Sequence, residues 1–298
     1  MKPFLRITTL ALILLSSTFV YAHSGRTDSK GCHTNKATGE YHCHTKTETA
    51  PPPAPATTET APVQTAPTAE QIATAPAQAN ILKLEYEGFT VWLDCSKRGA
   101  VKFMYHAQHD TGNAPRLNDF YLDSKVPSEC QQTTAKAYGK GYDRGHLVPA
   151  NHLDNSETAI KATNIMMNIL PQVANMNRGA WLQTEEIVEC YRDIDELLVI
   201  GGVVWGDYPS DDYFVTSHGV KTPDAYWKVI IRGSGQSEKV IAWIVPNTKD
   251  AKRANLDSYL VTIDQIEKMT GEKLPVADYS RHEKPPSSWL IPKGCNKG

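Results

Sequence analysis

The tract from Thr47 to Asn80 is the feature that most restricts how this 298-residue chain can fold. It is dominated by Pro, Ala and Thr, with consecutive prolines at 51–53. Such a composition cannot bury an apolar core and favours the extended polyproline II conformation. We therefore predict a semi-rigid linker over residues 47–80, which confines folded structure to residues 23–46 and 81–298. A chain of 298 residues has room for one large domain or two small ones, and we expect one folded domain over residues 81–298.

Residues 1–22 have the pattern of a secretory signal peptide. Lys2 and Arg6 give a positive start, and the apolar run from Leu10 to Val20 is too short for a membrane-spanning helix. Ala22 supplies a small residue where cleavage is expected. We predict export to a bacterial periplasm or to the medium, with no membrane attachment after cleavage. An uncleaved membrane anchor is the alternative.

A short Cys/His-rich module occupies residues 23–46. It holds Cys32, Cys43 and several histidines, and contains the sequence Tyr-His-Cys-His. It resembles the YHYH-type motif of exported bacterial proteins. In an oxidising compartment we favour a disulfide between Cys32 and Cys43. Zinc bound by the cysteines and histidines is an alternative, and copper chelation by His23 at a new N-terminus is another.

All six cysteines follow the expected cleavage point, and an even number in an exported chain suits full pairing. Four of them lie in the longer segment: Cys95, Cys130, Cys190 and Cys295. Four cysteines allow three pairings, which the sequence alone does not distinguish. We expect Cys95–Cys295, which would staple the two ends of the domain, and hence Cys130–Cys190.

Hydrophobic patterning along residues 81–298 predicts a mixture of strands and helices. The predicted strands are 89–94, 100–105, 197–205, 227–232 and 239–245. The predicted helices are 156–162, 178–194 and 256–269, the last of which stops at Gly271. The tail from Leu274 onward is Pro-rich and irregular.

The sequence Asp-Arg-Gly-His at residues 143–146 carries the chemistry. His146 has an ordinary pKa of about 6.5, so it can take a proton near neutral pH. Arg144 presents a fork of donors that matches a phosphate, and Gly145 permits a close backbone approach. Together these residue types suggest phosphodiester chemistry. A surface turn with a charged pair and a solvated His is the alternative.

Three further segments follow in order: Asn168-Ile169-Leu170-Pro171-Gln172, Asn177-Arg178-Gly179-Ala180-Trp181, and Glu185. With the Asp-Arg-Gly-His sequence, they make residues 81–298 resemble the DNA/RNA non-specific endonucleases, the ββα-metal (His-Me finger) nucleases that include endonuclease G. Val148 and Leu170 depart from the family pattern without touching a proposed catalytic atom. The resemblance implies an α+β fold with a central, mostly antiparallel sheet flanked by helices. It places the second strand of the ββα element at residues 163–170.

The resemblance also implies catalytic and metal-binding roles. His146 is expected to act as the general base and Arg144 to clamp the phosphate. Asn177 is expected to be the only direct protein ligand of one Mg²⁺, which Mn²⁺ could replace. Glu185 is expected to hold a metal-bound water. A helix N-cap is the alternative role for Asn177.

Other residues are expected to support the site. Asp143 would fix the loop or Arg144, and Asn168 would form a hydrogen bond near the metal or the substrate. Arg116 could line a phosphate groove or form a surface salt bridge. The remaining histidines of the domain are expected to be structural or on the surface: His106, His109, His152, His218 and His282.

The expected function is cleavage of DNA and RNA with little sequence preference. The net charge of −2 counts against a protein that grips nucleic acid through overall positive charge, so a local basic groove is needed. A catalytically silent module that binds nucleic acid or an envelope partner is the main alternative. Metal scavenging by residues 23–46 is a further one.

Overall fold

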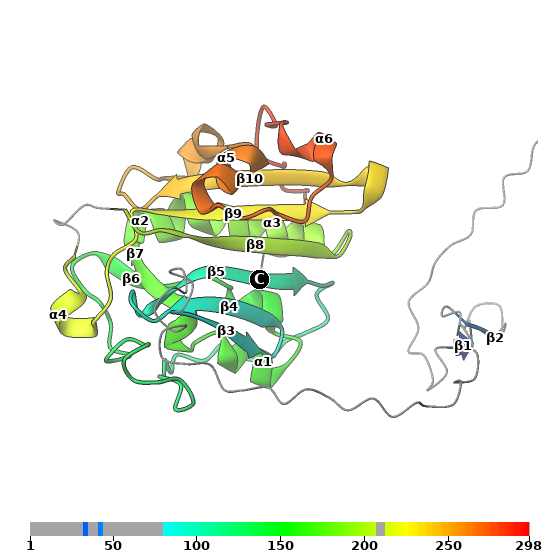
Figure 1. Ribbon diagram of the computed structural model, residues 1–298. Coiled ribbons are helices and arrows are strands. Elements are labelled where there is room, and N and C mark those ends of the chain that lie inside the picture. The colour runs from blue at the N-terminus through cyan, green and yellow to red at the C-terminus, as the bar shows by residue number, and fades with distance from the viewer. Residues whose placement is uncertain (1–31, 35–40, 44–79, 207–211, 298) are drawn as a thin grey trace, which may run out of the picture. The chain divides into compact units, whose positions relative to one another are not determined.

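The structure is a computed structural model that describes residues 32–34, 41–43, 80–206 and 212–297 (Figure 1). The predicted signal peptide and nearly all of the predicted linker lie outside these residues. Two short strands of the Cys/His module are described, β1 (Cys32–Thr34) and β2 (Tyr41–Cys43). They pair antiparallel, with the backbone of Cys32 opposite that of Cys43. The disulfide or metal site of this module stays a prediction.

A six-stranded antiparallel sheet forms the centre of the folded domain (Figure 1). Its strands are β3 (Ile81–Tyr86), β4 (Phe89–Asp94), β5 (Gly99–Ala107), β8 (Leu197–Val204), β9 (Ala225–Arg232) and β10 (Lys239–Pro246). Their order is β10-β9-β8-β5-β4-β3. Two ribbons of hairpins, β3-β4-β5 and β8-β9-β10, therefore meet where β5 pairs with β8. The predicted antiparallel sheet is confirmed, and β3 adds a strand to it.

Both faces of the sheet are covered. Successive side chains of a strand point to opposite faces, and those of β9 belong to two different cores. On β9, Tyr226 and Ile230 belong to a larger core that includes apolar side chains of α3 (Leu182–Arg192). Trp227 and Val229 belong to a smaller core with α5 (Ile263–Thr270). Figure 1 shows α3 passing behind the strands of the sheet.

The helix predicted at residues 256–269 is wrong in its first half. Residues Arg253–Tyr259 form a 3-10 helix, η7, and the α-helix α5 begins only after the Thr262 N-cap. Thr262 and Gln265 form a capping box, which fixes that start. The predicted stop is confirmed, since Gly271 takes a left-handed conformation with φ 73°.

The ββα element consists of β6 (Tyr142–His146), β7 (Ile169–Val173) and the helical segment that follows. The two strands pair antiparallel, with His146 opposite Ile169. Between them lie η2 (Ala150–Leu153), α1 (Glu157–Ala162) and η3 (Met166–Asn168). The helix predicted at residues 156–162 is α1, with Ser156 as its N-cap. The second strand is therefore β7, which begins at Ile169 and ends at Val173. Its predicted position at residues 163–170 is wrong, because the strand begins and ends later in the chain.

The helix predicted at residues 178–194 is divided. The helical segment found there begins earlier, with α2 (Ala174–Met176), and continues through a π-helical turn η4 (Asn177–Trp181) into α3. Gly179 leaves the helical dihedral angles at φ −112°, ψ −105°. A Cβ at this position would lie 2.9 Å from the carbonyl oxygen of Ala251, so close backbone packing explains the glycine.

Two disulfides are present in the described domain, Cys95–Cys130 and Cys190–Cys295. The expected pairing, Cys95–Cys295 with Cys130–Cys190, is therefore wrong. The C-terminal segment packs on α3 instead of reaching β4, because the Tyr191 hydroxyl donates to the carbonyl oxygen of Leu290 at 3.1 Å. The short helices α4 (Val215–His218), η6 (Gly235–Ser237) and α6 (Asp278–Arg281) complete the domain. Among the described helices, none combines the length and the apolar character needed to cross a bilayer.

Candidate active site

His146 ends β6 in the interior of the domain, and 6% of its surface is exposed. Its Nε2 lies 2.9 Å from Oδ1 of Asn164. The Asn164 amide is oriented by its own Nδ2, which donates to the carbonyl oxygen of Leu117 at 2.8 Å. Because Oδ1 can only accept, Nε2 of His146 carries the proton. Nδ1 is then the ring nitrogen that can take another proton.

Burial lowers the pKa of His146 to about 4. The positive charges of Arg116 and Arg144 lower it further, whereas the hydrogen bond to Asn164 opposes the shift. The imidazole is therefore neutral at pH 7, as a general base must be. A solvated His in a surface turn does not describe this residue.

Arg144 lies two residues before His146, on the same face of β6. Its Nη1 donates to the carbonyl oxygen of Ala135 at 2.9 Å, and the guanidinium carbon lies 3.8 Å from the centre of the Phe120 ring. The same ring lies 5.6 Å from the His146 ring. The guanidinium is thus held in a fixed orientation beside the imidazole, which a fork-like phosphate contact requires.

Arg116 is exposed on the loop that precedes Phe120. Its charge acts on two groups of the site, since it lowers the pKa of both His146 and Glu185. Among the described residues it forms no ion pair, so the surface salt bridge considered from the sequence is absent there. Because the charge of Arg116 acts on both His146 and Glu185, this position suits the expected role of Arg116 in a phosphate groove.

Asp143 lies on the opposite face of β6 and holds the π-helical turn. Its Oδ2 accepts hydrogen bonds from Asn177 Nδ2 and Arg178 Nε, both at 2.9 Å, and its Oδ1 accepts one from Arg178 Nη2 at 2.7 Å. The expected contact of Asp143 with Arg144 is thus replaced by contacts to Asn177 and Arg178. With Nδ2 engaged, Oδ1 is the atom of Asn177 that can ligate a cation.

The backbone at Asn177 excludes the N-cap alternative. Its dihedral angles are helical, at φ −55° and ψ −49°, and the π-helical turn has no side-chain cap. An N-cap residue has extended dihedral angles and bonds to a backbone N–H of the first turn. Single π-helical turns inside helices are frequent at functional sites.

Asn168 is fully buried and bonds only to backbone groups. Its Nδ2 donates to the carbonyl oxygens of Val148 and Thr163, and its Oδ1 accepts from the Val148 N–H, all at 2.9 Å. It therefore supports the site by joining the chain after His146 to the chain before Asn164. The expected hydrogen bond near the metal or the substrate stays a prediction.

Gly145 has a steric reason to be a glycine. A Cβ there would lie 2.2 Å from the side-chain carbonyl carbon of Gln172, which is fully buried on β7. The glycine and the glutamine therefore occur together because one fills the space that the other leaves open.

Lys228 is fully buried on β9, against the first turn of α3. Its Nζ lies 2.8 Å from Thr184 Oγ1 and 3.9 Å from the centre of the Trp181 ring. Burial lowers the pKa of Lys228 to about 8, and the charge of Glu185 opposes this shift. Burial raises the pKa of Glu185, and the charges of Lys228 and Arg116 oppose that shift. Lys228 thus favours the ionised form of Glu185.

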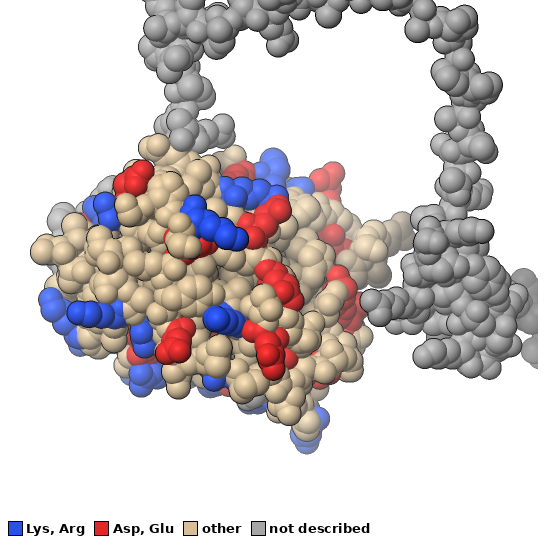
Figure 2. All heavy atoms as spheres, turned by 90° about the horizontal axis from the view of Figure 1, so that it is seen from below, with Lys and Arg blue, Asp and Glu red and all other residues tan. Residues whose placement is uncertain are grey.

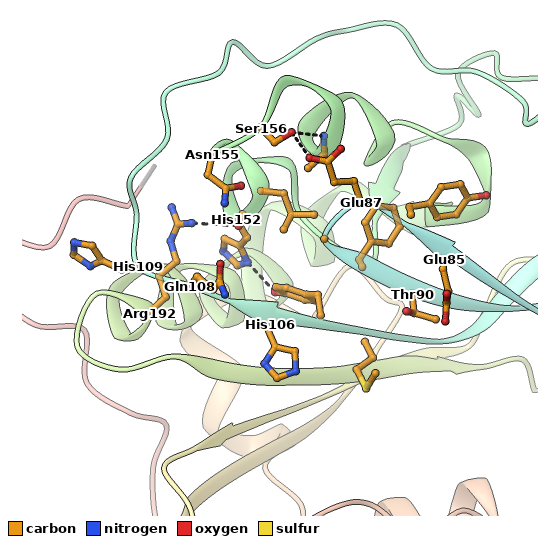
Figure 3. Close-up of a pocket in the computed structure, with 17 residues that line it drawn as sticks. Glu85, Glu87, Thr90, His106, Gln108, His109, His152, Asn155, Ser156 and Arg192 are labelled. Atoms are coloured by element: carbon orange, nitrogen blue, oxygen red, sulfur yellow. Dashed lines mark hydrogen bonds between the residues drawn. The ribbon is translucent and has the colours of Figure 1, made fainter. Parts of the chain in front are cut away.

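A buried polar network fixes α3 from the other side. His152 Nδ1 lies 2.8 Å from the Tyr105 hydroxyl, and its Nε2 lies 3.2 Å from the carbonyl oxygen of Glu185. Arg192 donates to the carbonyl oxygen of His152 at 3.2 Å and pairs with Glu189, whose pKa is raised by burial to about 7. In Figure 3, His152 and Arg192 line a cavity of about 500 Å³ that contains no residue of the proposed catalytic set. His152 therefore positions the helix that carries Glu185.

The other histidines have structural partners, as expected. Each is paired or hydrogen-bonded: His106 with Glu196, His109 with Asp193, His218 with Ser217, and His282 with Asp264.

The donor set suits a hard cation that keeps most of its water. Asn177 and Glu185 offer an amide oxygen and a carboxylate oxygen, which are ligands that Mg²⁺ and Mn²⁺ prefer. In the described part of the chain, no group of three or more His, Cys, Asp or Glu side chains could hold a metal ion. The residues present therefore fit Mg²⁺ bound through one or two protein oxygens.

Three site residues were not assigned a role from the sequence. Asn164 stands four residues before Asn168, so a second Asn in the same segment was the signal available. Lys228 interrupts a strand whose neighbouring residues are apolar, and a charge at such a position is itself informative. Phe120 lies in a loop with no periodic pattern, and it reaches the site because Tyr121 forms a bridge with Ile165.

Comparison with known proteins agrees with this geometry. Residues 68–281 match the DNA/RNA non-specific endonuclease family. The chain is 30% identical over 172 residues to a nuclease of Nostoc sp., an alignment that covers 54% of this chain and 60% of that protein. It is 26% identical over 197 residues to mitochondrial endonuclease G of Homo sapiens, covering 62% of this chain and 66% of that protein. The chain thus spans less than two thirds of the length of these relatives.

The fold is also found among solved structures. A chain in the crystal structure of the EndoG/EndoGI complex superimposes with a TM-score of 0.50 at 20% identity, covering 63% of this chain and 83% of that one. At this identity the likeness concerns the fold. Because the family match extends over most of the sequence, the chain belongs to the DNA/RNA non-specific endonuclease family.

Proposed function

We propose that this chain is an exported, Mg²⁺-dependent endonuclease that hydrolyses phosphodiester bonds of DNA and RNA with little sequence preference. The observation that carries the proposal is a buried, neutral His146, oriented by Asn164 and placed beside a stacked Arg144. The family match and the nucleases among the relatives support the same reaction.

In this proposal His146 takes the proton of the attacking water on Nδ1, while its Nε2–H stays bonded to Asn164. Arg144 and Arg116 orient the phosphate and offset its negative charge. Asn177 would hold the cation through Oδ1, and Glu185 would hold a water of the cation's hydration shell. When bound, Mg²⁺ supplies charge that stabilises the phosphate oxygens and the leaving oxygen in the transition state.

The test of the reaction is digestion of supercoiled plasmid and of total RNA by the purified protein, with Mg²⁺ or with EDTA. His146→Ala is the active-site variant, and His109→Ala is its control, because His109 is exposed and pairs with Asp193. We expect the wild type to digest both substrates with Mg²⁺ and neither with EDTA. Of the two variants, only His109→Ala should keep this activity. If His146→Ala keeps near-wild-type activity, the base assignment is wrong. If no protein cleaves with any divalent metal, the chain is a silent, binding module.

Export is supported by the pattern of residues 1–22 and by two disulfides, which persist in oxidising compartments. N-terminal sequencing of protein recovered from the periplasm and the medium of an expressing bacterium tests it. We expect the mature chain to begin at His23. Recovery of the uncleaved chain in the membrane fraction would favour the anchor alternative.

A further inference from the structure

A cavity of about 590 Å³ lies between residues 133–140, which precede β6, and the short helix α4. Among the described residues, its lining includes Lys136 and Lys140 and no acidic side chain, whereas three other cavities of the domain each contain at least one Glu. Figure 2 shows Lys and Arg side chains gathered at the end of the domain where α4 lies, at the left of Figures 1 and 2. In a chain of net charge −2, this is a local site suited to an anion.

An exposed aromatic ring forms one wall of the cavity. Tyr213 is 47% exposed, and Nζ of Lys140 lies 5.1 Å from the centre of its ring. The ring also packs against Tyr142, with the two ring centres 6.1 Å apart. Proteins hold unpaired nucleotides with this combination, because the base stacks on the ring and the phosphate meets the cation.

The cavity lies next to the catalytic strand β6, because its wall residue Tyr213 packs against Tyr142. Tyr142, Arg144 and His146 alternate along one face of β6, so about 13 Å of strand separates the first from the last. Arg144 also donates to the carbonyl oxygen of Ala135, within the segment that forms the cavity wall. A strand of nucleic acid whose scissile phosphate meets Arg144 therefore reaches Tyr213 within a few nucleotides.

The two walls are held together before any ligand binds. His218 of α4 lies with Nε2 3.1 Å from the carbonyl oxygen of Lys136, and its own carbonyl oxygen accepts from Thr133 N at 2.8 Å. The Tyr138 ring packs 4.8 Å from the rings of both Phe214 and His218. A preformed cavity loses little free energy to ordering when it binds.

We propose that this cavity is a nucleotide subsite for one unpaired strand. Tyr213 stacks on a base, Lys136 and Lys140 bind phosphates, and the site directs the nuclease towards single-stranded DNA or RNA. In a duplex the bases are stacked on one another, so the ring gains a base only from an unpaired segment. This inference rests on the proposed endonuclease function.

The test uses the full chain and four variants. Tyr213→Ala removes the ring and Tyr213→Phe keeps it. Lys140 has a left-handed backbone with φ 55°, so Lys140→Asn removes the charge while keeping a residue that tolerates this conformation. Tyr279→Ala is the matched control, because Tyr279 is also 47% exposed but lines a different cavity.

Steady-state kcat and KM are measured for a single-stranded oligonucleotide, its duplex, and thymidine 5′-(p-nitrophenyl phosphate), which is too short to reach Tyr213. We expect Tyr213→Ala to raise KM for the single strand about 10-fold at unchanged kcat, and Tyr213→Phe to resemble the wild type. The duplex, the small ester and Tyr279→Ala should show no change. Lys140→Asn should reduce the slope of log affinity against log salt by about 0.7 for the single strand.

An unchanged KM in Tyr213→Ala overturns the subsite, and so does an equal loss on all three substrates, which would indicate general damage. If the wild type cleaves none of the substrates, the proposed function fails instead. The subsite is then decided by fluorescence anisotropy with a labelled single strand in EDTA, where Tyr213→Ala must still weaken binding about 10-fold.

Discussion

His146 and Asn164 are joined through Nε2 and Oδ1 at 2.9 Å, and this contact determines which nitrogen of the imidazole can act as a base. The Asn164 amide cannot turn over without losing its bond to the carbonyl oxygen of Leu117. Orientation of the base therefore depends on a loop that lies upstream of β6 in sequence.

Substitution of Asn164 should separate orientation from acidity. Asn164→Ala removes the partner of Nε2, and we expect kcat to fall roughly 100-fold with KM nearly unchanged. Asn164→Asp keeps an acceptor but adds a negative charge, which favours the imidazolium and raises the pKa of His146. The acidic limb of the kcat/KM profile should then move to higher pH. If both variants keep the wild-type kcat and the wild-type pH profile, the contact has no role in catalysis.

Asp143→Asn should weaken metal use without unfolding the domain. The carboxylate holds Asn177 and Arg178, so its loss frees the proposed ligand to rotate. We expect the Mg²⁺ concentration for half-maximal activity to rise about 10-fold, as for other residues that orient a metal ligand. Arg178→Ala is the control, because exposed ion pairs contribute little. Equal Mg²⁺ titrations for Asp143→Asn and the wild type would contradict this role.

The burial of neutral His146 should make the domain sensitive to acid. Its folded pKa of about 4 lies below the ordinary 6.5, so the unfolded chain binds the proton preferentially between these values. The free energy of unfolding should therefore fall as pH drops from about 6.5 to 4, by up to ~3 kcal/mol from this residue. Urea unfolding of His146→Gln at pH 7 and pH 4.5 should show a smaller fall. The exposed variant His109→Gln should fall as steeply as the wild type.

Lys228→Met should shift the pH dependence of activity. The replacement fills a similar volume but leaves Glu185 without its neighbouring cation, and removal of one partner of a buried charge pair also lowers stability. Glu185 loses the neighbouring cation that opposes the rise of its pKa, so the acidic limb of activity should move to higher pH. In the Glu185→Gln background the same substitution should shift nothing. A shift of equal size there would assign the effect to another group.

The disulfides should contribute according to the lengths of the loops that they close. Cys190–Cys295 spans 105 residues and Cys95–Cys130 spans 35, so chain entropy assigns them about 5 and about 4 kcal/mol. We expect Cys190→Ser with Cys295→Ser to lower Tm at least as much as Cys95→Ser with Cys130→Ser. Peptide mapping of the unreduced protein checks the pairing first. A Cys95–Cys295 peptide would contradict the structure.

The sequence predicted most of the sheet because its strands carry local signals, namely apolar alternation and glycine-containing turns at residues 96–99 and 233–235. It misplaced β7 and the helix after it, because both are shaped by distant contacts. Asn168 bonds to Val148, and Gly179 packs against Ala251. Such contacts leave no periodic trace in the chain.

The catalytic motifs were located by resemblance, but their partners were not. Asp143 was expected to fix the loop or Arg144, yet alternation along β6 points the side chains of Asp143 and Arg144 to opposite faces. The prediction of the disulfide pairing was wrong for a related reason. It depends on where the C-terminal tail lies in space, and the tail packs on Tyr191 rather than on β4.

The pairing of β5 with β8 also has a consequence for how the domain folds. Ala107 lies opposite Leu197, and the chain between them carries all the residues proposed for catalysis and metal binding. Closing so long a loop is entropically costly, so we expect this pairing to form late in folding. Until it forms, the two hairpin ribbons are unconnected and the segment between them has no fixed ends. A newly made chain would thus bring the residues proposed for catalysis and metal binding into place only when the sheet becomes continuous.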